Sequence, residues 1–132
     1  MKKLFTALIL VLLSATVKAH DMTPTYPVLR DSYLEGLLVT EMEIFNKRND
    51  VEYYEIAVFD KDMNPIPFVT SYKVFKLPYL KKIKLEVYIR KNDEQRALYV
   101  CSRSRSLENN ISSTNISSMI CSKFRKNAPW KK

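Results

Sequence analysis

The sequence predicts an all-β fold, an antiparallel β-sandwich of about seven strands. Short runs in which apolar and polar residues alternate recur along the chain, which is the pattern of half-buried strands. Clusters of Asn, Asp, Pro and Ser separate these runs and supply turns. No convincing amphipathic helix interrupts the series. Strands without helices pack as sandwiches, and a chain of 132 residues suits one domain.

The first 19 residues have the pattern of a secretory signal peptide. Two lysines precede an apolar run over residues 4–13, and the segment ends in Val17-Lys18-Ala19, which suits the small-residue rule for signal peptidase. An uncleaved anchor is the alternative, but the apolar run is short for a bilayer span. We therefore expect a protein in the periplasm or secreted, with no stable membrane insertion after signal cleavage.

The rest of the chain divides into an arm, a sandwich and a tail. Residues 20–27 contain two prolines and no periodicity, which predicts an extended arm or an edge segment. The sandwich is expected over residues 28–126 and a basic tail over residues 127–132. The strands expected within the sandwich are Leu37–Asn46, Val51–Asp60, Val74–Leu77, Lys82–Arg90, Ala97–Ser102 and Met119–Arg125.

Two segments are expected to lack regular central strands. Pro67 keeps the residues after the Asn64-Pro65 turn from forming one, because proline cannot donate to a central ladder. Residues 103–118 are rich in serine and asparagine, which predicts a long loop or a mobile hairpin before the last strand.

Cys101 and Cys121 are the two cysteines of the chain, and we expect them to form one disulfide because export places the protein in an oxidising compartment. In the chain-entropy model such a bridge stabilises by about 3 kcal/mol. If the strands that carry the cysteines are neighbours, the bridge crosses their ladder and closes the ends of the 103–118 loop. Such a staple either only stabilises a small exported domain or also holds an edge strand ready for a partner.

The composition excludes several classes of chemistry. With one glycine, the chain cannot build the phosphate-binding loops GxGxxG or GxxxxGK[ST]. One histidine and two separated cysteines exclude a closed His/Cys zinc site and CxxC redox chemistry, and they leave one possible base for a Ser-His-Asp triad. The basic residues show no nucleic-acid-binding pattern. We therefore expect a protein that is not an enzyme, needs no cofactor and binds no nucleic acid.

His20 becomes the mature amino terminus if cleavage follows Ala19. Its amine and imidazole nitrogens would then chelate copper, with Asp21, Met22 or distant acids to complete the site, although tight Cu(II) sites prefer tetragonal nitrogen and oxygen ligands. This gives an alternative function, a periplasmic copper-binding carrier. The simpler interpretation is a terminal residue without defined contacts.

Five motifs follow one another between Val39 and Arg105: TEMEIFN, YYEIAVFDKD, NPIPF, VFKLPYLKKIKLEVYIR and ALYVCS. They correspond to a strand that ends in asparagine, a Tyr-Tyr strand before an acidic turn, a proline-containing crossover, a Leu-Pro turn before a strongly alternating strand, and the strand before a long loop. In their order and spacing they resemble the amino-terminal immunoglobulin-like domain of the PapD-like periplasmic pilus chaperones. The resemblance covers about half of the chain and implies that the sandwich is immunoglobulin-like.

The resemblance also implies a binding site. In that family an arginine on the first strand and a lysine on the last strand of this domain anchor the carboxyl terminus of a bound subunit, while apolar residues of the last strand complete the subunit's sheet by β-augmentation. The matching positions are Arg30 and Lys123, for which ordinary surface charge is the alternative. The apolar donors would be Met119, Ile120 and Phe124.

Together these observations predict an exported, non-enzymatic protein-binding domain with a chaperone-like or assembly-adaptor role in the cell envelope. Its partner would be another envelope or secreted protein. A copper-binding carrier that uses His20 is one alternative. A phage-encoded or structural envelope protein of unknown role is another.

Overall fold

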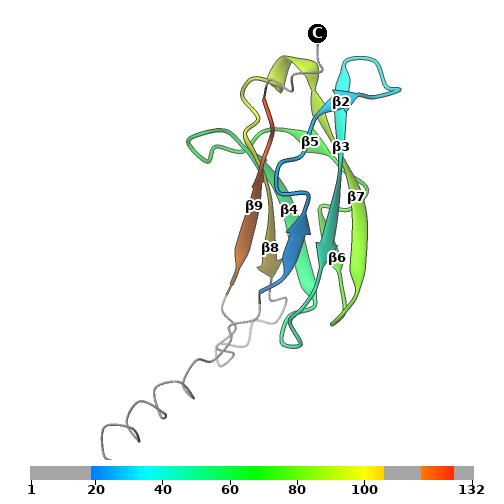
Figure 1. Cartoon of the computed structure of the whole chain (residues 1–132), viewed down its shortest axis with the longest axis vertical. Coiled ribbons are helices and arrows are strands. Elements are labelled where there is room, and N and C mark those ends of the chain that lie inside the picture. Colours follow the sequence, from blue (N-terminus) through cyan, green and yellow to red (C-terminus); the bar gives the residue numbers. More distant parts are fainter. Residues whose placement is uncertain (1–18, 106–116, 127–132) are drawn as a thin grey trace, which may run out of the picture.

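The computed structural model describes residues 19–105 and 117–126, which form two antiparallel sheets packed face to face (Figure 1). One sheet has the strand order β1-β3-β7-β5, with β2 also paired to β3, and the other has the order β6-β4-β8-β9. The predicted all-β sandwich with one disulfide is therefore confirmed. The basic tail, most of the signal peptide and much of the 103–118 loop lie outside the described residues.

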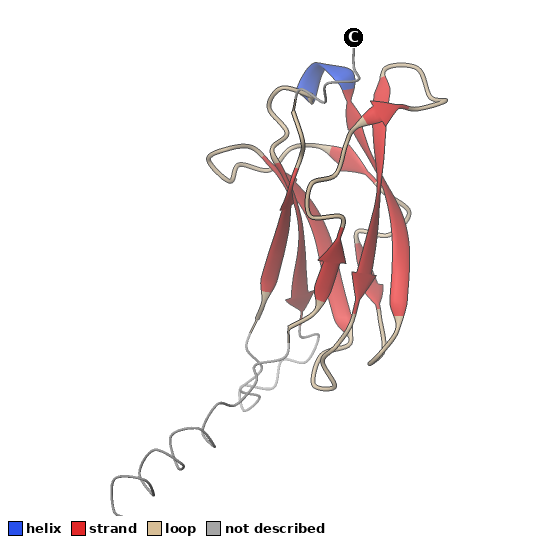
Figure 2. Ribbon diagram, in the orientation of Figure 1, coloured by secondary structure: helices blue, strands red, loops and turns tan. Residues whose placement is uncertain are grey.

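The described residues contain nine strands and one short 3-10 helix (Figure 2). The longer strands are β3 (Leu37–Phe45), β4 (Tyr53–Phe59), β7 (Lys82–Arg90), β8 (Tyr99–Arg105) and β9 (Met119–Lys123). The shorter strands are β1 (Asp21–Thr23), β2 (Arg30–Asp31), β5 (Phe68–Val69) and β6 (Val74–Lys76). The 3-10 helix η1 (Lys91–Asp93) follows β7, and none of the described helical structure is long and apolar enough to cross a membrane.

The core lies between the inward faces of β3, β4 and β7. β7 has the bounds that its alternating pattern predicts, and it pairs with β3 along its whole length, from Leu37↔Arg90 to Phe45↔Lys82. Every second side chain of these strands is buried, or in the case of Ile83 partly buried, as the two-residue period of a strand requires. The fully buried apolar residues include Met42, Ile44, Tyr54, Ile56, Val58, Val87, Ile89 and Val100.

β8 extends into the segment that the sequence predicts as loop. It runs to Arg105, and its last inward positions are Ser102 and Ser104, which are buried. Their hydroxyl groups form hydrogen bonds with His20 and Ser118. Because the inward side chains here are polar, the alternation of apolar and polar residues ends before the strand does.

Residues 20–27 lie at the edges of the two sheets, as the edge-segment alternative expects, and do not form a separate arm. β1 pairs with β3 and is followed by a cis Thr23-Pro24 peptide bond. The chain then forms backbone hydrogen bonds with the β9 segment and returns to β3 as β2. In Figure 1 this segment passes between β9 and β3, from one end of the sandwich toward the other. β1, β2 and β5 have two or three residues each and lie in proline-containing segments, where no period can be measured, so the sequence pattern does not reveal them.

Candidate functional site

The outer edge of β9 is an end of its sheet. Residues 118, 120, 122 and 124 direct their backbone groups toward β8. Two hydrogen bonds show this: the Ser104 N–H donates to the Ser118 carbonyl, and the Phe124 N–H donates to the Leu98 carbonyl, both at 2.9 Å. Alternate residues of an antiparallel strand direct their N–H and C=O groups to the opposite side. The residues that face the outer edge are therefore Met119, Cys121 and Lys123.

Residues 25–27 cover the half of this edge nearer the carboxyl end of β9. Lys123 donates its N–H to the Thr25 carbonyl at 3.1 Å, and Arg125 donates to the Pro27 carbonyl at 2.9 Å, so the segment runs parallel to β9. Pro27 has no N–H to return. β1 lies beside this half of β9, but within residues 19–105 and 117–126 no backbone group pairs with the outer side of Met119 or Cys121. We call this half the open edge of β9 (residues 119–121).

The apolar residues assigned to partner binding lie on opposite faces of β9. Met119 is 44% exposed, whereas Phe124 is 2% exposed and Ile120 packs against the core. The side chain of Phe124 is therefore part of the core, and it is not available to a partner. Of the three predicted donors, Met119 is the one that projects from the sandwich.

The disulfide Cys101–Cys121 attaches the open edge to β8. The two Cα atoms are 4.1 Å apart, at a ladder position where facing residues exchange no hydrogen bonds and lie closest. Cys101 is buried and Cys121 is exposed. The bridge therefore holds β9 against β8 in the same half where the other side of β9 lacks a partner strand.

Arg30 and Lys123, the two predicted anchors, lie on different sheets. Arg30 is on β2, opposite Val39 of β3, and Lys123 is on β9, opposite Tyr99 of β8. Both side chains are exposed. The fold does not bring them onto one strand pair, and residues 24–29 run between them.

A buried polar network lies beside the open edge. The ring of His20 is fully buried, with Nε2 2.7 Å from the Ser102 hydroxyl oxygen and Nδ1 3.2 Å from that of Ser118. The His20 ring also lies against Tyr54, with centroids 4.7 Å apart. Arg48 donates to the Ser118 hydroxyl at 3.3 Å. Because Ser118 precedes Met119, this network joins the segment before β1 to the start of the open edge.

The position of His20 bears on both interpretations of this residue. Its ring is not a terminal group without contacts, since serine hydroxyls engage both nitrogens. No cluster of three potential His, Cys, Asp or Glu metal ligands occurs in the described part of the chain. The copper site stays a prediction from the sequence, without a ligand set assembled around His20.

The buried His20 predicts a pH-dependent stability. Desolvation lowers the pKa of His20 below its ordinary value of 6.5. His20 of the unfolded chain therefore takes up a proton at a higher pH than His20 of the folded chain. The contribution of neutral His20 to the free energy of unfolding is complete above pH 6.5 and is lost as the pH falls below that value. We expect a slope of up to about 1.4 kcal/mol per pH unit in urea denaturation between about pH 7.5 and 5.

His20 is the only histidine of the chain, so a substitution at this position removes the whole histidine contribution to the pH dependence of stability. His20→Gln should be less stable at neutral pH and should lose most of the slope above about pH 5, where carboxylates contribute little. An unchanged slope in His20→Gln would contradict the assignment.

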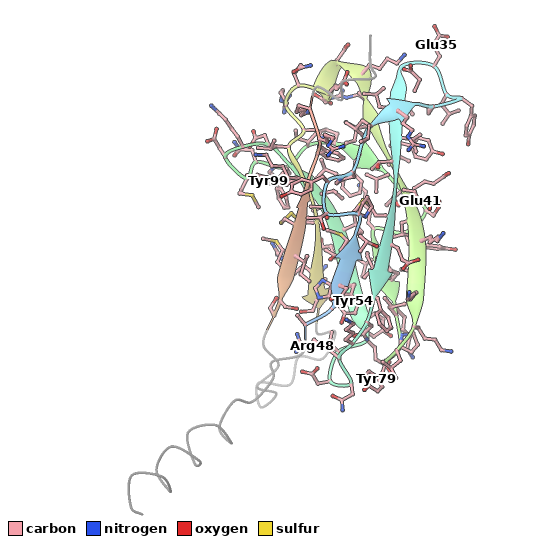
Figure 3. The ribbon with its side chains drawn as sticks, in the orientation of Figure 1. Glu35, Glu41, Arg48, Tyr54, Tyr79 and Tyr99 are labelled. Atoms are coloured by element: carbon pink, nitrogen blue, oxygen red, sulfur yellow. A yellow bond between two sulfur atoms is a disulfide. The ribbon has the colours of Figure 1, made fainter. Side chains whose placement is uncertain are left out.

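Asn46 is a buried hydrogen-bond centre at the same end of the sandwich. Its Nδ2 donates to the carbonyls of Val51 and Leu77, each at 2.8 Å. Its Oδ1 accepts from the Arg48 N–H at 2.8 Å and from the Tyr54 hydroxyl at 2.6 Å. Burial raises the pKa of Tyr54 to about 12, so this hydroxyl remains a donor at neutral pH. Asn46 therefore joins the turn after β3 to the turn before β7 and holds the Tyr54 hydroxyl. Tyr54 and Arg48, both labelled in Figure 3, lie toward this end.

Arg48 extends the network toward the surface. Its Nε and one terminal nitrogen donate to the two carboxylate oxygens of Asp50, at 2.9 and 2.5 Å. These hydrogen bonds hold the pKa of Asp50 below its ordinary value. The sequence places both residues in a polar turn, and nothing in that local pattern distinguishes an arginine that is 7% exposed from a solvated one.

Comparison with known proteins shows a likeness in fold. No protein-family model and no curated protein matches the sequence. Among solved structures, the chain is similar to the crystal structure of the E. coli chaperone DraB, with a TM-score of 0.62 and 18% sequence identity. The match covers 80% of this chain and 53% of that chain, so this chain spans about half of its length. At this identity the likeness shows the fold alone: the chain is an antiparallel β-sandwich similar to one in that chaperone.

Proposed function

We propose that the protein is an exported, non-enzymatic protein-binding domain with a chaperone-like or assembly-adaptor role in the cell envelope. The open edge of β9 is the observation that carries the proposal, because the outward N–H and C=O groups of Met119 and Cys121 have no backbone partner among the described residues. β1 lies alongside this half without pairing to it, so a partner strand that adds here takes the place of β1 beside β9. Strand addition obtains affinity from such main-chain groups and specificity from neighbouring side chains. The fold likeness to a chaperone and the signal-peptide pattern of residues 1–19 support this role.

The construction of β9 suits a strand that stays folded while its outer edge is exposed. Long, flat edge strands invite aggregation, and short ones reduce this hazard. The open edge is three residues long, is bridged to β8 by the disulfide, and ends where Thr25 begins to cover β9. An incoming strand would therefore have a defined length and a defined end.

Lys123 lies at that end and carries an exposed ammonium group. A carboxylate of a partner strand that pairs with the open edge would meet this charge. Arg30 is on the other sheet, so we assign the anchoring role to Lys123 first and to Arg30 second.

Met119→Pro is expected to abolish partner binding while the domain stays folded. Met119 directs its N–H away from β8, so proline removes a donor that the β8–β9 ladder does not use. The measurement is in vivo cross-linking of the exported protein to envelope proteins, followed by identification of the partner by mass spectrometry. Thermal unfolding of each purified variant checks that it is folded.

Val74→Pro is the matched control. Val74 lies on β6, the opposite end of the same sheet, and it also directs its N–H outward because the neighbouring residues Lys73 and Leu77 bond toward β4. This variant should retain the partner. Recovery of the same partner at the same level with Met119→Pro and Val74→Pro would exclude the open edge as the binding surface, and Lys123→Glu tests the anchor separately.

A further inference from the structure

The outer sides of the two sheets differ in charge. On the β6-β4-β8-β9 sheet, whose outer side we call the basic face, the outward carboxylate of the four strands is Glu55, and the outward cations are Lys76, Arg103, Arg105 and Lys123. On the other sheet the outward charges are balanced: carboxylates Asp21, Glu41, Glu43 and Glu86, and cations Arg30, Lys82, Lys84 and Arg90.

Arg103 and Lys123 keep their full charge on the basic face. Glu55 lies opposite Arg103, but its carboxylate pairs with Arg105 at 3.5 Å. The Arg103 guanidinium contacts the Met119 sulfur at 3.7 Å instead. In the described part of the chain, no carboxylate lies within ion-pair distance of Arg103 or Lys123. The basic face therefore has an excess of positive charge.

The other two cations of the basic face have weak partners. Lys76 pairs with Glu52 at 3.3 Å and Arg105 pairs with Glu55 at 3.5 Å, and the side chains of both cations are about half exposed. Exposed ion pairs contribute little, because water screens them. An anion outside the protein can therefore interact with all four cations.

The cations are distributed over the whole width of the sheet. Lys76 is on β6 and Lys123 is on β9, which are the two ends of the sheet (Figure 1). Three strand spacings separate these ends, a distance of roughly 14 Å. The aromatic and exposed apolar side chains among the cations are Tyr53, Tyr99, Val74 and Met119. A single phosphate or carboxylate would reach one part of this face, whereas an extended anionic surface would contact all of it.

We propose that the basic face binds the surface of an anionic phospholipid bilayer. Lysine and arginine pair with lipid phosphates, and arginine can donate to two phosphate oxygens at once. The Tyr53 ring suits the depth of the lipid headgroups, because it has an apolar body and a polar hydroxyl. A bilayer is the fitting occupant because its negative charges, like the cations of the basic face, are spread over a surface.

This proposal goes beyond the proposed function and shares with it the exported location. It does not depend on strand addition at β9. The backbone N–H and C=O groups of an edge strand lie in the plane of the sheet, so the open edge faces sideways when the basic face lies on a bilayer. Loss of partner cross-linking with vesicle binding retained would contradict the proposed function alone, and the reverse result would contradict the membrane proposal alone.

The test is co-sedimentation of the exported, disulfide-bonded protein with lipid vesicles. One set of vesicles contains phosphatidylcholine, and the other contains equal parts of phosphatidylcholine and phosphatidylglycerol. We expect binding to the anionic vesicles, with a loss of affinity between about 0.1 M and about 0.5 M salt because salt screens exposed charges. Spin-labelled lipid headgroups should broaden the NMR signals of β8 and β9 amides more than those of β3 and β7.

The double substitution Lys76→Gln and Arg103→Gln should weaken binding to the anionic vesicles by about 25-fold. This is about fivefold for each cation, which corresponds to about 1 kcal/mol. Both side chains are exposed, so the variant should fold normally.

Lys82→Gln with Lys84→Gln is the matched control. It changes the net charge by the same amount, but on the outer side of the other sheet, where Lys82 pairs with Glu43 at 3.3 Å and Lys84 pairs with Glu41 at 3.6 Å. Its affinity should stay within about twofold of the unmodified protein. Equal binding to both kinds of vesicle, equal weakening by the two double variants, or binding to polyglutamate without binding to anionic vesicles would each overturn the proposal.

Discussion

Replacing Asn46 with alanine is expected to lower the free energy of unfolding by about 3–5 kcal/mol, because it leaves several buried polar groups without partners. The side chain is fully buried and serves the carbonyls of Val51 and Leu77, the N–H of Arg48 and the hydroxyl of Tyr54. Small domains have only about 5–15 kcal/mol in total. Urea denaturation at neutral pH measures the loss.

Asn64→Ala is the matched control for this substitution. Asn64 is exposed and its Nδ2 donates to the Asp60 carboxylate at 3.2 Å, so its removal should cost less than about 1 kcal/mol. Tyr54→Phe removes one of the four bonds to Asn46 and should cost about 1–2 kcal/mol. Similar losses for Asn46→Ala and Asn64→Ala would show that the network contributes little.

Removing the disulfide by the double substitution Cys101→Ala and Cys121→Ala is expected to cost about 3 kcal/mol in the chain-entropy model. The bridge closes a loop between residues separated by 20 positions. The effect should be local as well as global, because β9 bonds to one strand along its open half. Hydrogen exchange of the β9 amides should therefore accelerate more than exchange in the β3–β7 pair.

Reduction of the unmodified protein provides an independent version of this experiment. Dithiothreitol should lower the free energy of unfolding by the same amount and should have no effect on the double variant. A double variant with unchanged stability and unchanged exchange in β9 would contradict a stapling role for the bridge.

The long strands are the part of the fold that local sequence pattern predicts well. β7 has apolar residues at every second position, and β3 and β4 also alternate, so burial of one face is sufficient to determine their direction. The disulfide is predictable for a simpler reason, since the chain has two cysteines and therefore one possible intramolecular pair.

The site is less predictable, because its parts come from segments with no local signal. Ser102 is buried beside His20, and Ser104 beside Ser118, because the segment that begins at His20 folds against β8. In the sequence Phe124 is an apolar residue next to the last strand and therefore a candidate for contact with a partner, yet its side chain points into the core. Lys76 and Arg105 are far apart in the chain, and only the pairing of β4 with β6 and β8 places them on one face.

The sequence by itself determined the all-β class, the buried faces of the long strands and the disulfide pair. The class and the buried faces follow from the two-residue period, which is a local property of the sequence. The disulfide follows from the number of cysteines, since two cysteines allow one pair. The tertiary structure alone decided that His20 is buried, that residues 20–31 alternate between the two sheets, and which backbone groups of β9 remain unpaired. The physical reason is that an open edge is defined by where a distant segment does or does not pair, and no short stretch of sequence contains that information.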